Sequence, residues 1–375
     1  MSKSINSLGL MSGTSGDGVD ASIINSDGKG QFKVLINKYF QYTNDISENI
    51  YKLKRKINKV EDIKKYISEI NNLERKITLF HSNVVLDCIK NNDFEIDLIG
   101  FHGQTILHSP KDKYSKQLGD GKLLSQLSKK KVIYNFRQND LVEGGEGAPL
   151  SPIFHQLIVK EKKIDFPICI LNIGGISNLT LIGDLKEENL ISKDIGPGNC
   201  LIDEWMRRNK KGNYDKNGEA ASIGNTNELI LNQALEDFEN ITDININSFD
   251  VNDFEINFLR GLDLEDGAST ITDFTSNIIA SKLLNEISKS DLKISKIILC
   301  GGGRKNKTLI DRIKKHCGRE FKFETTDDYG VDGDFVESQA FAFLAIRSFF
   351  KLPISFPNTT GCKLPSTGGV LVKNF

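Results

Sequence analysis

The chain of 375 residues is long enough for two domains of ordinary size, each with a buried core. Its 49 Lys and Arg residues nearly balance its 50 Asp and Glu residues, which argues against a global field that would attract nucleic acid or an anionic membrane. The cysteines form no CxxC pair, which favours reduced thiols over a disulfide framework or a zinc site. The N-terminus lacks the layout of a signal peptide and no apolar run is as long as a membrane span, so we expect a cytoplasmic protein with a small-molecule partner.

The N-terminal third predicts a meander of strands followed by helices. Apolar runs at 5–11, 19–24 and 32–40 are separated by short turns, which leave no room for a helix between them. Residues 47–90 carry apolar side chains at helical spacing and predict one or two long amphipathic helices. A buried-type strand is then expected at 96–101, directly before the sequence His-Gly-Gln-Thr.

The same order returns in the C-terminal half. Runs at 168–173 and 178–184 predict strands, helices are expected from 199 to about 290, and a strand, a triple-glycine turn and a helix follow at 293–317. This pattern predicts an α/β fold of two duplicated domains that face a cleft. We expect one domain at 1–135, completed by 350–375, and the other at 136–349.

The first turn, MSGTSGDGVD (11–20), matches parts of two nucleotide-binding motifs by accident. A Rossmann turn needs a following helix and a later acidic residue, and a P-loop needs Lys and Ser/Thr after its last glycine. The chain instead continues with a β-prone run, has no carboxylate at 36–40, and places Val19 and Asp20 after Gly18. What remains is a hairpin whose tip can offer N–H groups and hydroxyls to phosphate. A turn that only reverses the chain explains the stretch equally well.

Two further glycine turns also follow predicted strands, at 174–175 and 301–303. Each alone is more typical of a structural turn. Three in this order resemble the two phosphate loops and the adenosine loop of the sugar kinase, Hsp70 and actin superfamily, whose members bind ATP between two domains. The resemblance implies two actin/Hsp70/sugar-kinase-like (ribonuclease H-like) domains. It also implies ATP contacts from Ser12, Gly13, Thr14, Ser15, Gly16, Asp17, Gly18, Val19, Asp20, Gly174, Gly175, Gly301, Gly302 and Gly303.

Segments spread from residue 9 to about residue 368 narrow the resemblance to the anhydro-N-acetylmuramic acid kinase family. They include GLMSGTSGDGVD (9–20), FHGQT (101–105), GGEGAPLSPIFH (144–155), NIGGISNLT (172–180), DIGPGNCLID (194–203) and DFVESQAFAFLA (334–345). The chain departs from the family pattern at Gly16, where a bulky apolar residue is usual, and the glycine should loosen the hairpin tip. It also departs at Glu146, where glutamine is usual, which adds a negative charge to that loop.

The resemblance implies ATP-dependent phosphorylation of 1,6-anhydro-N-acetylmuramic acid in the recycling of cell-wall peptidoglycan. Water attacks the anomeric carbon, the anhydro bridge opens, and the freed O6 takes the γ-phosphoryl group to give N-acetylmuramic acid 6-phosphate and ADP. Asp194 is the expected general base, and Glu337 the carboxylate that positions water or a sugar hydroxyl. Asp194 is expected directly after a short strand and before the helix that begins near Asn199. By position alone, a helix cap is somewhat more typical of Asp194 than a catalytic base, and a solvated helix residue explains Glu337 about equally well.

Substrate contacts are expected from His102, Gln104, Thr105 and Asn178. Gln104 ranks first because an amide can both donate to and accept from sugar hydroxyls, whereas a lone histidine is more often structural. Asp17 and Asp20 would repel a bare phosphate, so Mg²⁺ is expected beside them together with ATP. The expected partner is a small anhydro amino sugar, and binding to nucleic acid or a membrane is not expected. The sequence leaves open whether the protein forms a homodimer.

Two other functions also stay open from the sequence. A kinase of the same fold could act on a free hydroxyl of another amino sugar, and Asp194 would then deprotonate that hydroxyl instead of water. A non-enzymatic ATP-dependent switch or filament protein would need a polymer or partner surface. The sequence shows no exposed apolar stretch or long appendage that supplies one.

Overall fold

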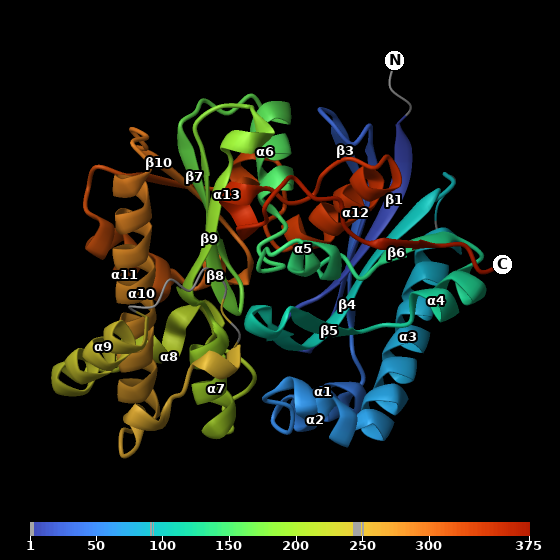
Figure 1. Cartoon of the computed structure of the whole chain (residues 1–375). Coiled ribbons are helices and arrows are strands. Elements are labelled where there is room, and N and C mark those ends of the chain that lie inside the picture. The colour runs from blue at the N-terminus through green and yellow to red at the C-terminus, as the bar shows by residue number, and fades with distance from the viewer. Residues whose placement is uncertain (1–3, 91, 93, 243–248, 250) are drawn as a thin grey trace. The chain divides into compact units, whose positions relative to one another are not determined.

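The computed structural model describes residues 4–90, 92, 94–242, 249 and 251–375. The chain divides into two compact units, whose segments can be followed in Figure 1. The first unit comprises Met1–Ile164, Leu185–Ile191 and Phe335–Phe375, and the second Asp165–Asp184 and Ser192–Asp334.

Described residues of the first unit form a seven-stranded sheet in the order β12-β6-β4-β1-β2-β3, with β5 paired to β4. Its strands are β1 (Ile5–Ser12), β2 (Gly18–Ser26), β3 (Phe32–Gln41), β4 (Leu98–Ser109), β5 (Tyr114–Leu118), β6 (Lys131–Tyr134) and β12 (Val370–Val372). Its helices are α1 (Asn44–Lys54), α2 (Val60–Lys65), α3 (Ile67–Lys90), α4 (Gly121–Ser128), α5 (Gln138–Val142), α6 (Pro152–Glu161), α12 (Val336–Phe349) and α13 (Pro357–Thr360). β1 is antiparallel to β2 and parallel to β4, so a hairpin and a crossover meet at β1.

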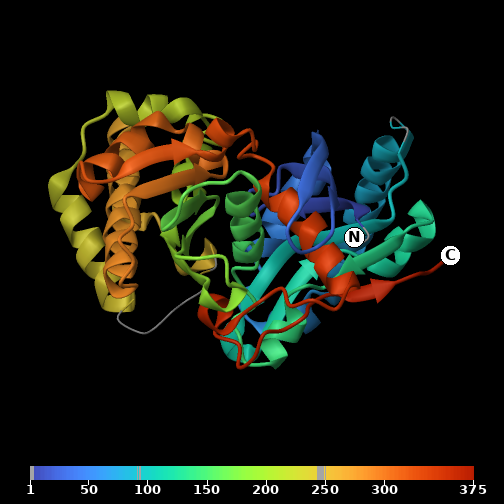
Figure 2. The same ribbon diagram turned by 90° about the horizontal axis from the view of Figure 1, so that it is seen from above.

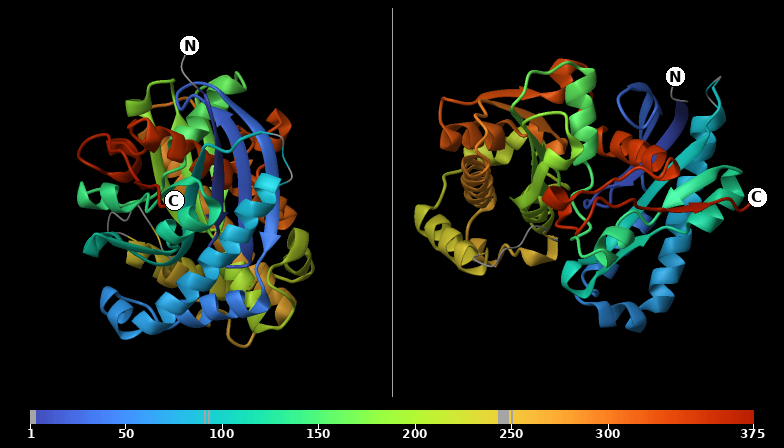
Figure 3. Two further views of the ribbon diagram at one scale, coloured as in Figure 1. Left: turned by 90° about the vertical axis from the view of Figure 1, so that its right-hand side faces the viewer. Right: turned by 45° about the horizontal axis from the view of Figure 1, so that its top comes forward.

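Alternation along β1 explains how helices cover both faces of this sheet. Leu8 and Leu10 are fully buried and belong to the core that includes side chains of α1 and α3. Gly9, between them, faces α12, where a Cβ would lie 1.9 Å from the carbonyl oxygen of Ser338. Successive residues of a strand point to opposite faces, so α1 and α3 pack on one face and α12 on the other (Figures 2 and 3).

The predicted strands of the N-terminal meander are confirmed, but residues 47–90 belong to three helices instead of one or two. The break before α2 has a local cause. The Asp62 carboxylate accepts from the backbone N–H groups of Asn58 (3.1 Å) and Lys59 (3.3 Å), which competes with a continuous helix. The strand expected at 96–101 also runs further, to Ser109, because β5 turns back and pairs with it.

Described residues of the second unit form a five-stranded sheet in the order β11-β10-β7-β8-β9. Its strands are β7 (Ile168–Ile173), β8 (Ile176–Ile182), β9 (Ile191–Pro197), β10 (Lys296–Cys300) and β11 (Lys322–Thr325), and its helices are α7 (Cys200–Arg208), α8 (Glu219–Ile223), α9 (Glu228–Thr242), α10 (Leu264–Lys289) and α11 (Lys307–Cys317). As in the first unit, the first strand pairs with an antiparallel hairpin partner on one side and with a parallel strand on the other. The predicted duplication is therefore confirmed at the level of topology.

The units begin and end at other residues than the predicted domains, because packing ties residues after 135 to the first unit. The ring of Phe154 in α6 lies 5.2 Å from that of Phe32 and 5.7 Å from that of Phe343 in α12. Arg347 of α12 is 1% exposed and donates to both carboxylate oxygens of Glu187, at 2.9 and 2.7 Å. Residues 136–164, 185–191 and 335–349 thus belong with the N-terminal sheet. Across the described part of the chain, every helix is too short or too polar to cross a membrane.

Candidate active site

The turn between β1 and β2 is held from inside the first unit by buried polar side chains. The backbone N–H of Gly16 donates to the carbonyl of Gly13 (3.2 Å) and closes the turn. The Ser12 hydroxyl, 1% exposed, lies 2.8 Å from the Gly18 carbonyl, 2.9 Å from Oε1 of Gln104 and 2.8 Å from the Tyr42 hydroxyl. Because β2 follows directly, the rejection of a Rossmann turn is confirmed. The side chain of Ser12 therefore supports the turn from inside, whereas Thr14 and Asp17 are exposed.

Helix α1 supports the same turn from another side. The Tyr51 hydroxyl donates to the carbonyl of Ser15 (2.7 Å), and Nζ of Lys54 donates to the carbonyl of Thr14 (2.9 Å). Gly16 is buried with a φ of +64°, and a Cβ at this position would lie 3.0 Å from Cγ2 of Ile50. Glycine adopts this backbone conformation readily, and Ile50 occupies the space beside it. Sequence reasoning missed Tyr51 and Lys54, because nothing in the spacing of a helix shows which loop its side chains reach.

Gln104 and His102 both bond within the protein. Nε2 of Gln104 donates to the carbonyl of Gly13 (2.9 Å), and the side chain is fully buried. Nδ1 of His102 donates to the carbonyl of Gly103 (2.9 Å), while Nε2 accepts from Nε (3.2 Å) and Nη2 (3.0 Å) of Arg137. Burial, followed by the Arg137 charge, holds the pKa of His102 well below its usual range, so the ring is neutral. Through Arg137, which donates to the Gly147 carbonyl (2.8 Å), the histidine braces the loop that contains Glu146.

A cavity of about 220 Å³ lies in the first unit beside His102. Further lining side chains come from Tyr114, Gln117, Tyr134, Asn135 and Gln138. Gln117 also donates through Nε2 to the hydroxyl of the half-buried Thr105 (3.3 Å), which places Thr105 next to a lining residue. Amide and hydroxyl groups around one cavity suit a ligand that carries several hydroxyls.

Asp194 lies inside β9, whereas the sequence predicted a place after a strand. The strand is longer than expected because it continues to Pro197. The Asp194 side chain is buried, and Oδ2 accepts from the backbone N–H of Phe249 (3.1 Å). The N-terminus of α7 follows at Cys200 and is tied to the second glycine turn, since the N–H groups of Asn199 and Cys200 donate to the carbonyls of residues 174 (2.8 Å) and 175 (3.2 Å). Asp194 and this turn therefore belong to one local structure.

Asn178 of β8 stands opposite Asn172 in the pairing of β7 with β8. Its Oδ1 atom is buried and has no hydrogen-bond partner among the described residues. An unpaired buried acceptor costs about 1–3 kcal/mol, so an external donor would stabilise this position. Glu337, the other predicted catalytic carboxylate, is half-buried in the first turn of α12 and belongs to the first unit.

The glycines of the three turns differ in whether the surrounding atoms leave room for a Cβ. At Gly301, with a φ of +79°, a Cβ would lie 2.4 Å from Oδ1 of Asn172, and at Gly303 it would lie 2.3 Å from Cγ2 of Ile173. At Gly302 a Cβ would meet no described atom within 4 Å. Gly13 and Gly174 are similar, since the nearest atoms would lie at ordinary contact distances of 3.7 and 3.4 Å. Each turn thus contains at least one glycine that packing does not require.

Two units with the same strand order, each with a glycine turn after its first strand, define the two-domain class of the sugar kinases, Hsp70 and actin. The family model for anhydro-N-acetylmuramic acid kinase matches residues 5–374. A protein of that name from Pelagibacter ubique (strain HTCC1062) is 54% identical over 375 residues and is covered completely, as is this chain. A second, from Zymomonas mobilis subsp. mobilis, is 38% identical over 368 residues, or 96% of this chain and 98% of the relative. The chain belongs to the anhydro-N-acetylmuramic acid kinase family.

Among solved structures, a ROK family glucokinase from Streptomyces griseus, in complex with glucose and AMPPNP, aligns with 91% of this chain and 99% of its own. The TM-score is 0.39 and the sequence identity 11%.

Proposed function

We propose that the protein uses ATP and water to convert 1,6-anhydro-N-acetylmuramic acid into N-acetylmuramic acid 6-phosphate and ADP. Family membership over nearly the whole chain supports this substrate. The structural observation that carries the proposal is Asp194, a buried carboxylate on the strand that leads into the loop bonded to the second glycine turn.

Two bonds break in the reaction, one from the anomeric carbon to O6 and one from the γ-phosphorus to the oxygen of ADP. Asp194 takes a proton from water as the water oxygen bonds to the anomeric carbon, and the bond from that carbon to O6 breaks. The freed O6 bonds to the γ-phosphorus, and ADP leaves. Glu337 orients the water or a sugar hydroxyl as the second carboxylate. The Asp194 carboxylate is buried, so little solvent has to rearrange when it accepts the proton.

ATP is expected at the three glycine turns, residues 12–20, 174–175 and 301–303. The glycines that packing does not require, Gly13, Gly174 and Gly302, leave room for phosphate or ribose to approach the backbone. Asp17, which is exposed beside the first turn, and Asp20 offer carboxylate oxygens of the kind that Mg²⁺ prefers. When bound with ATP, the metal ion would neutralise charge on the phosphates.

For the sugar, Thr105 and the cavity beside it offer hydroxyl and amide groups, and Asn178 offers an unpaired buried oxygen. His102 and Gln104 were expected to touch the sugar directly. Because their ring and amide atoms are engaged within the protein, we propose that they act by holding the loop with Glu146 and the first glycine turn. A cytoplasmic location, where ATP is available, agrees with this function, and the product of the reaction belongs to the recycling of peptidoglycan.

Asp194→Asn tests the proposed base, since the amide keeps the size of the side chain but cannot take the proton. We expect kcat on the anhydro sugar to fall about 10²- to 10⁴-fold, with ADP binding measured by calorimetry within about twofold. Asp165→Asn, an exposed carboxylate in the same unit, is the matched control and should keep full activity. Full activity of Asp194→Asn would remove the proposed base.

A further inference from the structure

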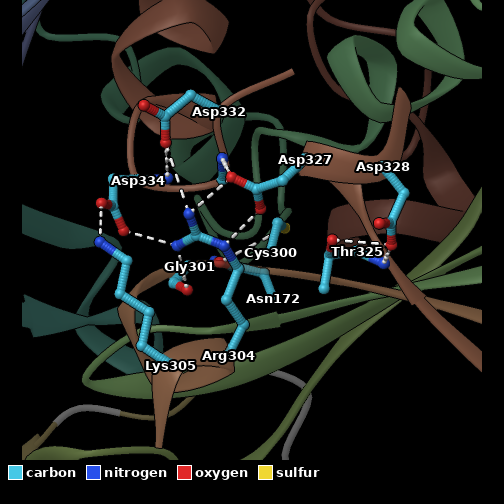
Figure 4. A network of polar contacts seen from close by, with 11 residues as sticks. Asn172, Cys300, Gly301, Arg304, Lys305, Thr325, Asp327, Asp328, Asp332 and Asp334 are labelled. Carbon is cyan, nitrogen blue, oxygen red and sulfur yellow. Dashed lines mark hydrogen bonds and ion pairs between the residues drawn. The ribbon is translucent and has the colours of Figure 1, made fainter. Parts of the chain in front are cut away.

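Arg304 lies at the end of the third glycine turn and is almost completely enclosed, with 6% of its side chain exposed (Figure 4). Nε and Nη2 donate to the two carboxylate oxygens of Asp327, at 2.7 and 3.0 Å. Nη1 donates to the carbonyl of Gly301 (3.1 Å) and to Asp334 (2.5 Å), and Nη2 also reaches Asp332 (3.4 Å). A guanidinium has five N–H donors, and these contacts use all five.

The loop that supplies these carboxylates, residues 327–334, is joined to the glycine turn at two further points. The N–H of Gly301 donates to the carbonyl of Gly333 (3.0 Å). A Cβ at Gly333 would lie 2.4 Å from Nε of Arg304, so this glycine lets the loop pass directly beside the guanidinium. The arginine therefore fills the space between the turn and the loop.

The pKa shifts of Arg304 and Asp327 agree with a charged guanidinium held between carboxylates. Burial alone would lower the pKa of Arg304, but its hydrogen bonds to Asp327 and Asp334 outweigh burial and raise it. The pKa of Asp327 is lowered, chiefly by its hydrogen bond to Arg304. Without the arginine, three carboxylates would surround the turn with Lys305 as the remaining cation in the network. Such a turn would repel a nucleotide phosphate.

We propose that Arg304 is a positioning residue that fixes the shape of the turn 301–303 for the nucleotide and does not itself bind the nucleotide. The inference rests on the proposed function in that it takes this turn to be part of the ATP site. Its basis is independent of the sugar chemistry, since all five donors of the guanidinium are directed at the turn and at the loop 327–334.

Two variants test the inference by different routes. Arg304→Lys keeps a positive charge but loses the planar fork, and Asp327→Asn keeps the arginine but loses its two-point partner. We expect both to raise the Kd for ADP, measured by calorimetry, about tenfold, and to raise the KM for ATP to a similar extent. The KM for the sugar and kcat should stay within about twofold. Arg208→Lys, at an exposed ion pair with Glu204 in the same unit, is the control and should leave all these values unchanged.

The outcomes separate positioning from direct contact. If the arginine could bind nucleotide phosphate, Asp327→Asn would release it and tighten ADP binding, and Arg304→Lys would retain most of the affinity; either result overturns the inference. Should Arg304→Lys fail to fold in a thermal scan, Asp327→Asn still decides. Wild-type protein that binds ADP but does not phosphorylate the anhydro sugar would contradict the proposed function alone. Wild-type protein that does not bind ADP would overturn the inference as well.

Discussion

At the scale of single residues, the three glycines of the turn 301–303 have different structural roles, although the sequence does not distinguish them. Gly301 and Gly303 are required where the turn packs against Asn172 and Ile173, whereas Gly302 faces space that no described atom fills. A residue that folding does not require is the one at which a ligand can approach the backbone closely. This difference gives a prediction that separates binding from stability.

Gly302→Ala should leave the free energy of unfolding within about 0.5 kcal/mol, because the added methyl group meets no neighbour. The same methyl group should hinder the nucleotide and raise the Kd for ADP about tenfold, or about 1.4 kcal/mol. Gly303→Ala is the matched control. It should destabilise the protein by about 1–3 kcal/mol because its Cβ would overlap Ile173.

Urea unfolding and calorimetric titration with ADP measure the two effects on the same samples. Equal ADP affinity in wild type and Gly302→Ala would mean that the nucleotide does not approach this turn. That result would remove the third glycine turn from the proposed site.

The strands and turns beside the candidate site were easier to predict from the sequence than the direction of their side chains. The apolar run before His102 predicted a buried strand, and that strand exists. The amide of Gln104 bonds inward to Ser12 and Gly13, although its place at a strand end suggested a contact with sugar. Tyr51 and Arg304 were missed for the same reason. Tyr51 reaches a turn that is distant in sequence, and Arg304 bonds to carboxylates of a separate loop. Only the packed structure shows these partners.

At the scale of elements, helix α3 carries a histidine into the core of the first unit. His81 is fully buried, Nδ1 donates to the carbonyl of Ile77 (2.8 Å), and its ring lies 4.9 Å from that of Phe101. Nε2 has no hydrogen-bond partner among the described residues. Burial lowers the pKa of His81 to about 4, so the folded protein keeps the ring neutral where an unfolded chain would protonate it.

The sign of the resulting pH dependence follows from proton linkage. Between the unfolded pKa of about 6.5 and the folded value of about 4, the unfolded state binds the additional proton, so stability falls as the pH falls through this window. The shift corresponds to about 3 kcal/mol between neutral pH and pH 4. Burial lowers the pKa of His155 to about 3, and this histidine acts in the same direction.

His81→Leu removes this group from the linkage. We expect the variant to lose less stability than wild type between pH 7 and pH 4.5, as measured by urea unfolding at each pH. Parallel curves for the two proteins would show that His81 does not titrate differently in the folded and unfolded states.

The bounds of elements were predictable where polar turns separate apolar runs, as in β1, β2 and β3. They were less so where a distant partner extends a strand. β4 continues to Ser109 because β5 pairs with it, and Asp194 lies inside β9 instead of after a strand. The helical stretch 47–90 is interrupted because Asp62 caps the start of α2, a contact that the apolar spacing does not encode.

At the scale of the whole molecule, the duplicated topology could be predicted because each half repeats the order of strands, glycine turn and helices. The division of the chain could be predicted only in part, since residues 350–375 join the first unit as expected but 136–164, 185–191 and 335–349 join it as well. Arg347 pairs with Glu187 across 160 residues and Phe154 packs on Phe343, so three separate segments form the first unit. A boundary placed by sequence order cannot reflect such contacts, since they join segments that composition does not mark as related.

In the proposed function, opening of the anhydro ring and transfer of the phosphoryl group are one ATP-dependent reaction. The most direct test is to incubate the protein with ATP and 1,6-anhydro-N-acetylmuramic acid, and separately with N-acetylmuramic acid, and to identify the products by mass spectrometry. We predict the 6-phosphate from the anhydro sugar with one ADP for each product, and an unopened sugar when ATP is omitted. Phosphorylation of N-acetylmuramic acid without any phosphorylation of the anhydro sugar would contradict the account.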